Sequence, residues 1–206
     1  MAGDSEETKD PEKEVIQRAL DAFDLTRARA INGYAEYEHH LGMLFQQLLG
    51  AEMQKSFAVF SSILNTQARG KLIFKLLNLS HGGDYDVFFE SLLEKLSGLD
   101  PLRAKIAHWV VLVSRTGGEP FDTKKGVCLH RHPDLFAEDR MYKWDVEDFT
   151  RKADFYRLLV LSFYLHLKGS PDPGDPSKTP WREIFQNKVT YPPDSNHQLH
   201  RFLKKV

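Results

Sequence analysis

The segment Leu99-Asp-Pro-Leu-Arg-Ala-Lys-Ile-Ala-His-Trp109 combines a helix start with two residues that could carry chemistry. Asp100 is suited to cap a helix, and Pro101 is suited to its first turn. Arg103 and His108 then lie five residues apart inside an apolar run. Because a buried charge costs several kcal/mol unless a partner compensates it, we expect this pair to face a cleft or an interface, or to be tied into local hydrogen bonds.

Apolar residues recur at helical spacing on both sides of this segment. The last such pattern is apolar nearly all round, so we expect that helix to be central. A further apolar pattern covers residues 52–64. Besides the helix that starts near Asp100, the spacing predicts helices over residues 12–25, about 27–49, about 66–78, 84–97 and about 146–168. Gly33 and Gly42 reduce helix propensity but permit close approach of another helix.

Two short β-compatible runs lie between the Arg103/His108 helix and the last long helix. They cover residues 110–113 and 126–132, and they either pair as a hairpin or form an irregular excursion. The predicted fold class is therefore all-α, a bundle of about five or six helices with a small β-like insertion before the last long helix.

Composition divides the chain into three parts. Residues 1–11 are polar and acidic and are predicted to be a disordered N-terminal tail. Residues 12–168 are predicted to form one helical domain. Residues 169–206 begin with a Pro-rich linker, and we expect this C-terminal extension to pack loosely, or on a partner.

The overall charge and the cysteine count limit the functions that this chain can have. The 206 residues carry a formal net charge of −1, so a polyanion would need a local basic patch. Cys128 is the single cysteine, which excludes an intramolecular disulfide. The acidic start is unlike a signal peptide, and no apolar run approaches the roughly 20 residues of a membrane span. We expect a soluble, cytoplasmic protein without a membrane partner. Phosphate-loop, dinucleotide, serine-hydrolase and zincin motifs are absent from the sequence, and no cofactor is predicted.

The order of these elements resembles bacterial helical-bundle proteins of the HEPN superfamily over about residues 30–168. Three motifs carry the resemblance: Tyr34-Ala-Glu-Tyr-Glu38, Arg69-Gly-Lys-Leu-Ile-Phe-Lys75, and Leu102-Arg-Ala-Lys-Ile-Ala-His108 before the β-like excursion. The last is similar to the Arg-x4-His signature of that superfamily.

The resemblance implies metal-independent RNA cleavage by a homodimer. Arg103 would hold the scissile phosphate, and His108 would act as general acid or base on the attacking ribose 2′-hydroxyl. These residue types suit the chemistry, because guanidinium is a planar fork for phosphate oxygens and imidazole titrates near neutrality. Glu38 and Lys105 are candidate supporting residues.

A catalytically inactive helical interaction module, of the defence or toxin–antitoxin type, is the alternative. Ala104 favours it, because catalytic members of the superfamily usually carry a polar residue, often Asn, directly after the arginine. In this case the partner is an antitoxin or another assembly protein. Arg103 would then pair with an acidic side chain, for which Glu38, Glu90 and Glu94 are available.

Two further groups are candidates for binding. Arg69, Lys71 and Lys75 could form a basic edge that contacts RNA phosphates, or a solvated helix face. Cys128, His130 and His132 would share one face of a strand and are suitable Zn²⁺ ligands. Because no fourth ligand is near in sequence, a basic patch is favoured over a metal site there, and no metal residue is predicted.

Overall fold

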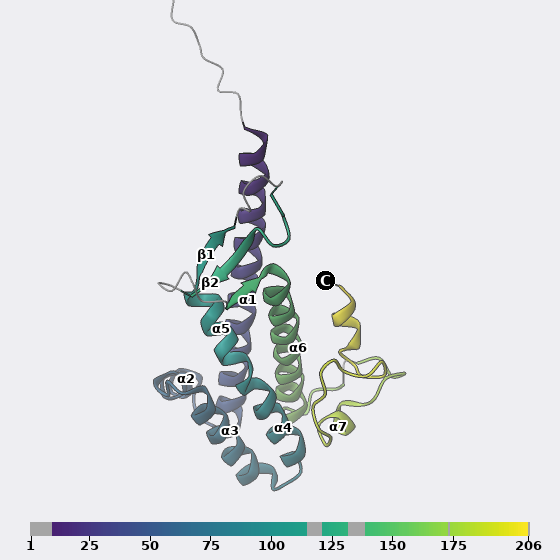
Figure 1. The fold of residues 1–206 in the computed structure, drawn as a ribbon. Helices are drawn as coiled ribbons and strands as arrows, with labels where there is room; N and C mark the ends of the chain where they lie inside the picture. Colours follow the sequence, from purple (N-terminus) through teal and green to yellow (C-terminus); the bar gives the residue numbers. More distant parts are fainter. Residues whose placement is uncertain (1–9, 115–120, 132–138, 173, 206) are drawn as a thin grey trace, which may run out of the picture.

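The computed structural model describes residues 10–114, 121–131, 139–172 and 174–205. Within these ranges the chain is a mostly α-helical bundle with one small three-stranded sheet (Figure 1), which confirms the predicted fold class. Residues 1–9 of the predicted disordered tail lie outside the described ranges. The helices are α1 (Pro11–Leu49), α2 (Met53–Ser62), α3 (Thr66–His81), α4 (Asp86–Ser97), α5 (Leu99–His108), α6 (Lys143–Leu167) and α7 (Trp181–Ile184), with a 3-10 helix at His200–Lys205. No helix in the described part of the chain is both long and apolar enough to cross a membrane.

Helix α1 is one continuous helix of 39 residues, where the sequence pattern predicted two, over 12–25 and about 27–49. Neither Gly nor Pro interrupts the region where the two patterns meet. The hydroxyl of Thr26 donates to the carbonyl of Ala22 at 2.8 Å, so its polar group is satisfied inside the helix. Phe23 and Ala30, on either side of the predicted break, are both buried and lie seven residues apart, so one buried face continues through the whole helix.

Helices α1 and α6 lie side by side along the length of the bundle, and the first turns of α1 project beyond its body (Figure 1). Ala30 and Ala153 are fully buried, one on each helix, and small side chains permit close packing. The rings of Tyr34 and Phe149 stack with centroids 6.2 Å apart. The predicted central position of the last long helix is thus confirmed.

Two glycines let neighbouring helices approach closely. A Cβ at Gly42 of α1 would lie 2.7 Å from the Phe57 ring of α2. A Cβ at Gly70 of α3 would lie 2.5 Å from a Leu93 methyl of α4. Gly42 therefore has the packing role that the sequence suggested.

Helix α5 begins one residue before the predicted cap. Gly98 is its N-cap, and Asp100 lies within the first turn with Pro101, so the prediction that Asp100 caps this helix was wrong. Its carboxylate instead accepts a hydrogen bond from the hydroxyl of Tyr34 on α1. The tertiary partner decides the role of this carboxylate.

The two β-compatible runs pair as an antiparallel hairpin, which decides between the alternatives left open by the sequence. Strand β1 (Val110–Val113) pairs with β2 (Val127–His130), and Val110 lies opposite His130. A third strand, β3 (Arg140–Tyr142), pairs with β2 on its other side and was not predicted. Helix α6 follows β3 without a loop, which brings its start to Lys143.

The C-terminal extension packs into the core of the same chain. Phe185 is 0% exposed, and its ring lies 5.0 Å from that of Phe163 on α6 and 5.4 Å from that of Trp181. The backbone N–H of Val189 donates to the Ser91 hydroxyl at 2.8 Å. The expectation that this extension packs loosely, or on a partner, is corrected, because the Pro-rich stretch leads to a segment with large apolar anchors.

Candidate functional site

Arg103 lies half-buried on α5 against an aromatic ring of α1. Its Cζ atom lies 5.3 Å from the centroid of the Tyr34 ring, a cation–π distance. In the part of the chain that the structure describes, its guanidinium has no ion pair and no hydrogen bond, so the alternative pairing with Glu38, Glu90 or Glu94 is not found. The five N–H donors of this side chain are therefore available to an anion.

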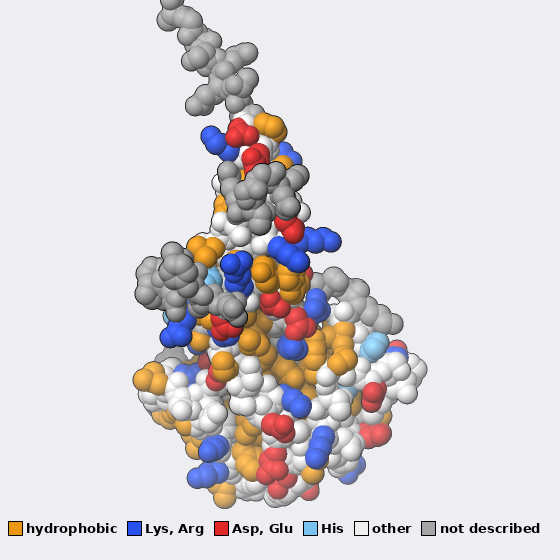
Figure 2. Space-filling model, in the orientation of Figure 1, with side chains coloured by type: hydrophobic (Ala, Val, Ile, Leu, Met, Phe, Trp, Pro, Cys, Tyr) orange, Lys and Arg blue, Asp and Glu red, His pale blue; other side chains and the backbone are white. Residues whose placement is uncertain are grey.

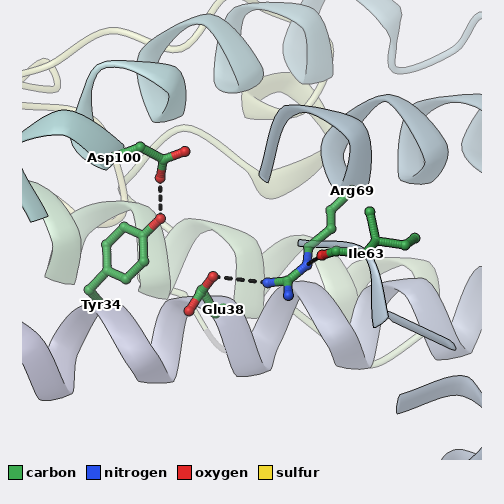
Figure 3. Close-up of polar contacts among 5 residues, drawn as sticks. All are labelled: Tyr34, Glu38, Ile63, Arg69 and Asp100. Atoms are coloured by element: carbon green, nitrogen blue, oxygen red, sulfur yellow. Dashed lines mark hydrogen bonds and ion pairs between the residues drawn. The ribbon is translucent and has the colours of Figure 1, made fainter. Parts of the chain in front are cut away.

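The ring that packs against the Arg103 guanidinium belongs to Tyr34, which is itself held in place. The tyrosine is only 2% exposed, and its hydroxyl donates to a carboxylate oxygen of Asp100 (Figure 3). Burial, followed by this hydrogen bond, raises the pKa of Tyr34 well above its ordinary value. The phenol therefore stays protonated, keeps its hydrogen bond, and holds its ring in place under the guanidinium.

His108 is exposed in the last turn of α5, and a residue that the sequence reading missed holds that turn. The guanidinium of Arg27, on α1, donates from Nε to the carbonyl of Ile106 at 2.7 Å and from Nη2 to that of Ala107 at 2.9 Å. These contacts satisfy carbonyls that the end of a helix leaves without partners. The partners are 79 and 80 positions apart, and an arginine inside an amphipathic helix gives no sequence signal for them.

The two predicted catalytic side chains have different surroundings. Five residues along a helix correspond to a rotation of about 140°, so they lie on different faces of α5. Arg103 packs against α1, whereas His108 is open to solvent. No contact between these two side chains is found among the described residues.

Lys105, a predicted supporting residue, is engaged away from Arg103. Its Nζ lies 3.3 Å from a carboxylate oxygen of Asp139 and 4.7 Å from the centroid of the Trp109 ring. These contacts attach the end of α5 to the chain just before β3. Lys105 thus helps to position the end of the helix that carries His108.

Glu38 and Arg69 form a clamp with each other. Arg69 donates from Nη1 to Glu38 Oε1 at 3.0 Å and from Nε to the Ile63 carbonyl at 2.6 Å (Figure 3). Its Cζ also lies 5.0 Å from the Phe60 ring centroid. The clamp joins α1, α2 and α3, so Arg69 is engaged within the bundle and does not lie open in a basic edge, while Glu38 pairs with Arg69.

Lys71 and Lys75 are exposed on α3 and have no ion pair among the described residues. Lys71 also lines a pocket of about 200 Å³ between α1, α3 and α4, together with Tyr37, Leu41 and Asp100. The predicted basic edge is therefore reduced to two lysines.

The Cys128, His130 and His132 combination is only partly described, because His132 lies outside the described residues. Cys128 and His130 are each 1% exposed on β2. The Nδ1 atom of His130 lies 3.0 Å from the Arg131 carbonyl oxygen, and burial raises the pKa of the Cys128 thiol. No group of three possible metal ligands occurs within the described ranges.

Comparisons of the chain with protein-family models, with curated proteins and with solved structures found no match.

Proposed function

We propose that this chain is a HEPN-like RNA-binding protein that acts as a metal-independent endoribonuclease when two copies associate. Arg103 holds the scissile phosphate, and His108 acts as general acid or base on the 2′-hydroxyl. The observation that carries the proposal is the arginine itself, which is half-buried over the Tyr34 ring without a carboxylate partner among the described residues. A half-buried guanidinium without an ion pair is a favourable place for a phosphate.

The surroundings of His108 agree with this role. The ring is exposed and therefore accessible to a substrate. Arg27 holds the carbonyls of Ile106 and Ala107, which keeps the end of α5 that carries this ring in place. Because the two side chains lie on different faces of α5, the proposal places Arg103 of one chain and His108 of the other in each site of a homodimer.

The test is cleavage of a labelled RNA pool in the presence of a metal chelator. We expect cleavage by the wild type that leaves 2′,3′-cyclic phosphate ends, and its loss in Arg103→Ala and in His108→Ala. His39→Ala is the matched control, because His39 is an exposed histidine on α1 and outside the proposed site. Circular dichroism verifies that each variant is folded.

Complementation tests the shared site. When Arg103→Ala and His108→Ala are mixed and allowed to exchange subunits, a mixed dimer carries one site with both functional side chains. We expect the mixture to regain cleavage that neither variant has alone. A site made within one chain gives no recovery, which would contradict the dimeric arrangement.

A second function, a catalytically inactive interaction module of the toxin–antitoxin type, is favoured by a separate observation. Leu64 and Leu79, before and near the end of α3, are 91% and 83% exposed. Met53 and Val59 of α2 are also exposed. A contiguous patch of exposed apolar side chains is typical of a surface that binds another protein, and Leu64 with the exposed residues of α2 is the proposed place for it. If the folded wild type neither binds nor cleaves RNA, the interaction module is the function that remains.

A further inference from the structure

An exposed pair of stacked aromatic rings lies where β3 meets α6. The rings of Tyr142 and Trp144 have centroids 4.5 Å apart and planes 21° apart, and Trp144 is 41% exposed. Arg140 precedes them on β3. Because side chains alternate along a strand, Arg140 and Tyr142 lie on the face of β3 opposite to that of the buried Met141, and Arg140 is exposed. We call Arg140, Tyr142 and Trp144 the aromatic ladder.

A groove of about 610 Å³ lies beside Trp144. Its lining combines apolar residues of α1 with three cations, Arg18, Lys124 and Lys143, and one carboxylate, Glu147. Figure 2 shows Lys and Arg side chains gathered beside apolar ones where the projecting part of α1 meets the body. Arg18 and Lys143 form ion pairs with Glu14 and Glu147 that are exposed to solvent, and such pairs are weak enough for a phosphate to replace.

Two further cations of this surface are open to an anion. Lys124 and Arg140 are exposed and have no ion pair in the described part of the chain. An aromatic face beside unpaired cations is the combination by which proteins bind single-stranded nucleic acid, since each base stacks on a ring and each phosphate meets a positive charge.

The β-sheet relates the aromatic ladder to the end of α5. Arg140 lies opposite His130 on β2, and His130 lies opposite Val110 on β1, so the three residues form one row across the sheet. Two strand spacings place the backbone of Arg140 about 10 Å from that of Val110. Val110 follows His108 by two residues, so the backbone of Arg140 lies within the length of a few nucleotides of the proposed acid or base.

We propose that the aromatic ladder and its groove bind single-stranded RNA, with an unpaired base stacked on Trp144 and phosphates near Arg140 and Lys124. This inference rests on the proposed RNA-directed function and names the surface that binds the substrate. The bound strand must be unpaired, because a base inside a duplex has no free face for the tryptophan.

Fluorescence anisotropy with a labelled single-stranded RNA of mixed sequence tests the aromatic ladder, with catalysis blocked by His108→Ala in every protein. We expect Trp144→Ala to weaken binding about tenfold or more, and Trp144→Phe to retain most of the affinity. Lys124→Gln should weaken binding less and make it less sensitive to salt. The same sequence as a duplex should bind more weakly than the single strand.

Phe202→Ala is the matched control, because Phe202 is another exposed aromatic residue beside an arginine. The Cζ atom of Arg201 lies 4.9 Å from the centroid of the Phe202 ring. Its affinity should equal that of the parent protein. If the parent binds RNA and Trp144→Ala binds equally well, or if Phe202→Ala loses as much, the aromatic ladder is not the binding surface while the proposed function stands. If the parent binds no RNA, the proposed function itself fails.

Discussion

The hydroxyl of Tyr34 donates a hydrogen bond to the carboxylate of Asp100 and thereby joins the middle of α1 to the first turn of α5 (Figure 3). The same tyrosine ring lies under the guanidinium of Arg103. One buried phenol thus fixes both the start of α5 and the surroundings of the proposed phosphate-binding arginine.

Tyr34→Phe removes the hydroxyl and leaves the Asp100 carboxylate without its donor. Because hydrogen bonds to charged groups contribute about 1.5–3 kcal/mol, we expect the free energy of unfolding in urea to fall by about 2 kcal/mol. Asp100→Asn keeps a carbonyl acceptor for the phenol, so its loss should be smaller. A Tyr34→Phe protein as stable as the wild type would show that this contact contributes nothing to folding.

Alkaline pH should destabilise the fold through Tyr34 and Tyr37. Burial is the largest cause that raises the pKa of each above the ordinary value near 10. Both therefore stay protonated in the folded state while the unfolded chain ionises. Stability from these groups is complete below pH 10 and is lost as the pH rises toward the folded pKa values, by about 1.4 kcal/mol per pH unit for each tyrosine. Urea unfolding at pH 9 to 11 measures this slope. Tyr37→Phe should remove the part of the slope that Tyr37 contributes. A slope unchanged by this substitution would contradict the assignment.

Arg69→Lys should destabilise the fold although it conserves the charge. A lysine cannot donate to both Glu38 and the Ile63 carbonyl while it lies over the Phe60 ring. We expect thermal or urea unfolding to show a loss of about 2 kcal/mol. Lys71→Ala, on the exposed face of the same helix, is the control and should change stability by less than about 0.5 kcal/mol.

RNA affinity gives a second readout for the same pair of variants. If Arg69 contacted phosphate, as the sequence suggested, Arg69→Lys would retain affinity and the salt dependence of binding. The structure instead predicts that any effect of Arg69→Lys on binding follows its loss of stability. A folded Arg69→Lys protein with a large affinity loss and unchanged stability would contradict the clamp.

His197 should make the C-terminal extension sensitive to acid. Burial lowers the pKa of His197 to about 4, and its Nδ1 accepts a hydrogen bond from the Leu199 N–H at 3.0 Å. The unfolded chain binds a proton below about pH 6.5 and the folded chain does not, so stability falls as the pH decreases from 6.5 toward 4. We expect this contribution to be on the order of 2 kcal/mol, because the ring keeps some solvent contact.

The measurement is urea unfolding between pH 7 and pH 4, with His197→Asn as the test variant. Asparagine retains an acceptor near the Leu199 N–H but does not titrate, so the pH dependence should be shallower than in the wild type. Equal slopes in wild type and His197→Asn would exclude His197 as the source.

Apolar spacing along the chain was enough to predict the helical class, the central last helix and the β-like insertion. Helices are periodic over a few residues, so apolar spacing reports them locally. Whether the runs 110–113 and 126–132 pair as a hairpin could not be predicted, because the pairing of short strands depends on what covers them. Strand β3 gave no pattern, since three residues are too short for alternation to be distinctive.

Tertiary structure alone decided what the polar residues do. Asp100 looked like a cap, but it accepts from Tyr34 because α1 brings a buried phenol to it. Arg69 looked like a surface cation, yet it joins three helices. Arg27 gave no signal at all, because its carbonyl partners are about 80 positions away. Side-chain partners of this kind arise from packing between distant segments, and a single sequence encodes that packing only through the whole fold.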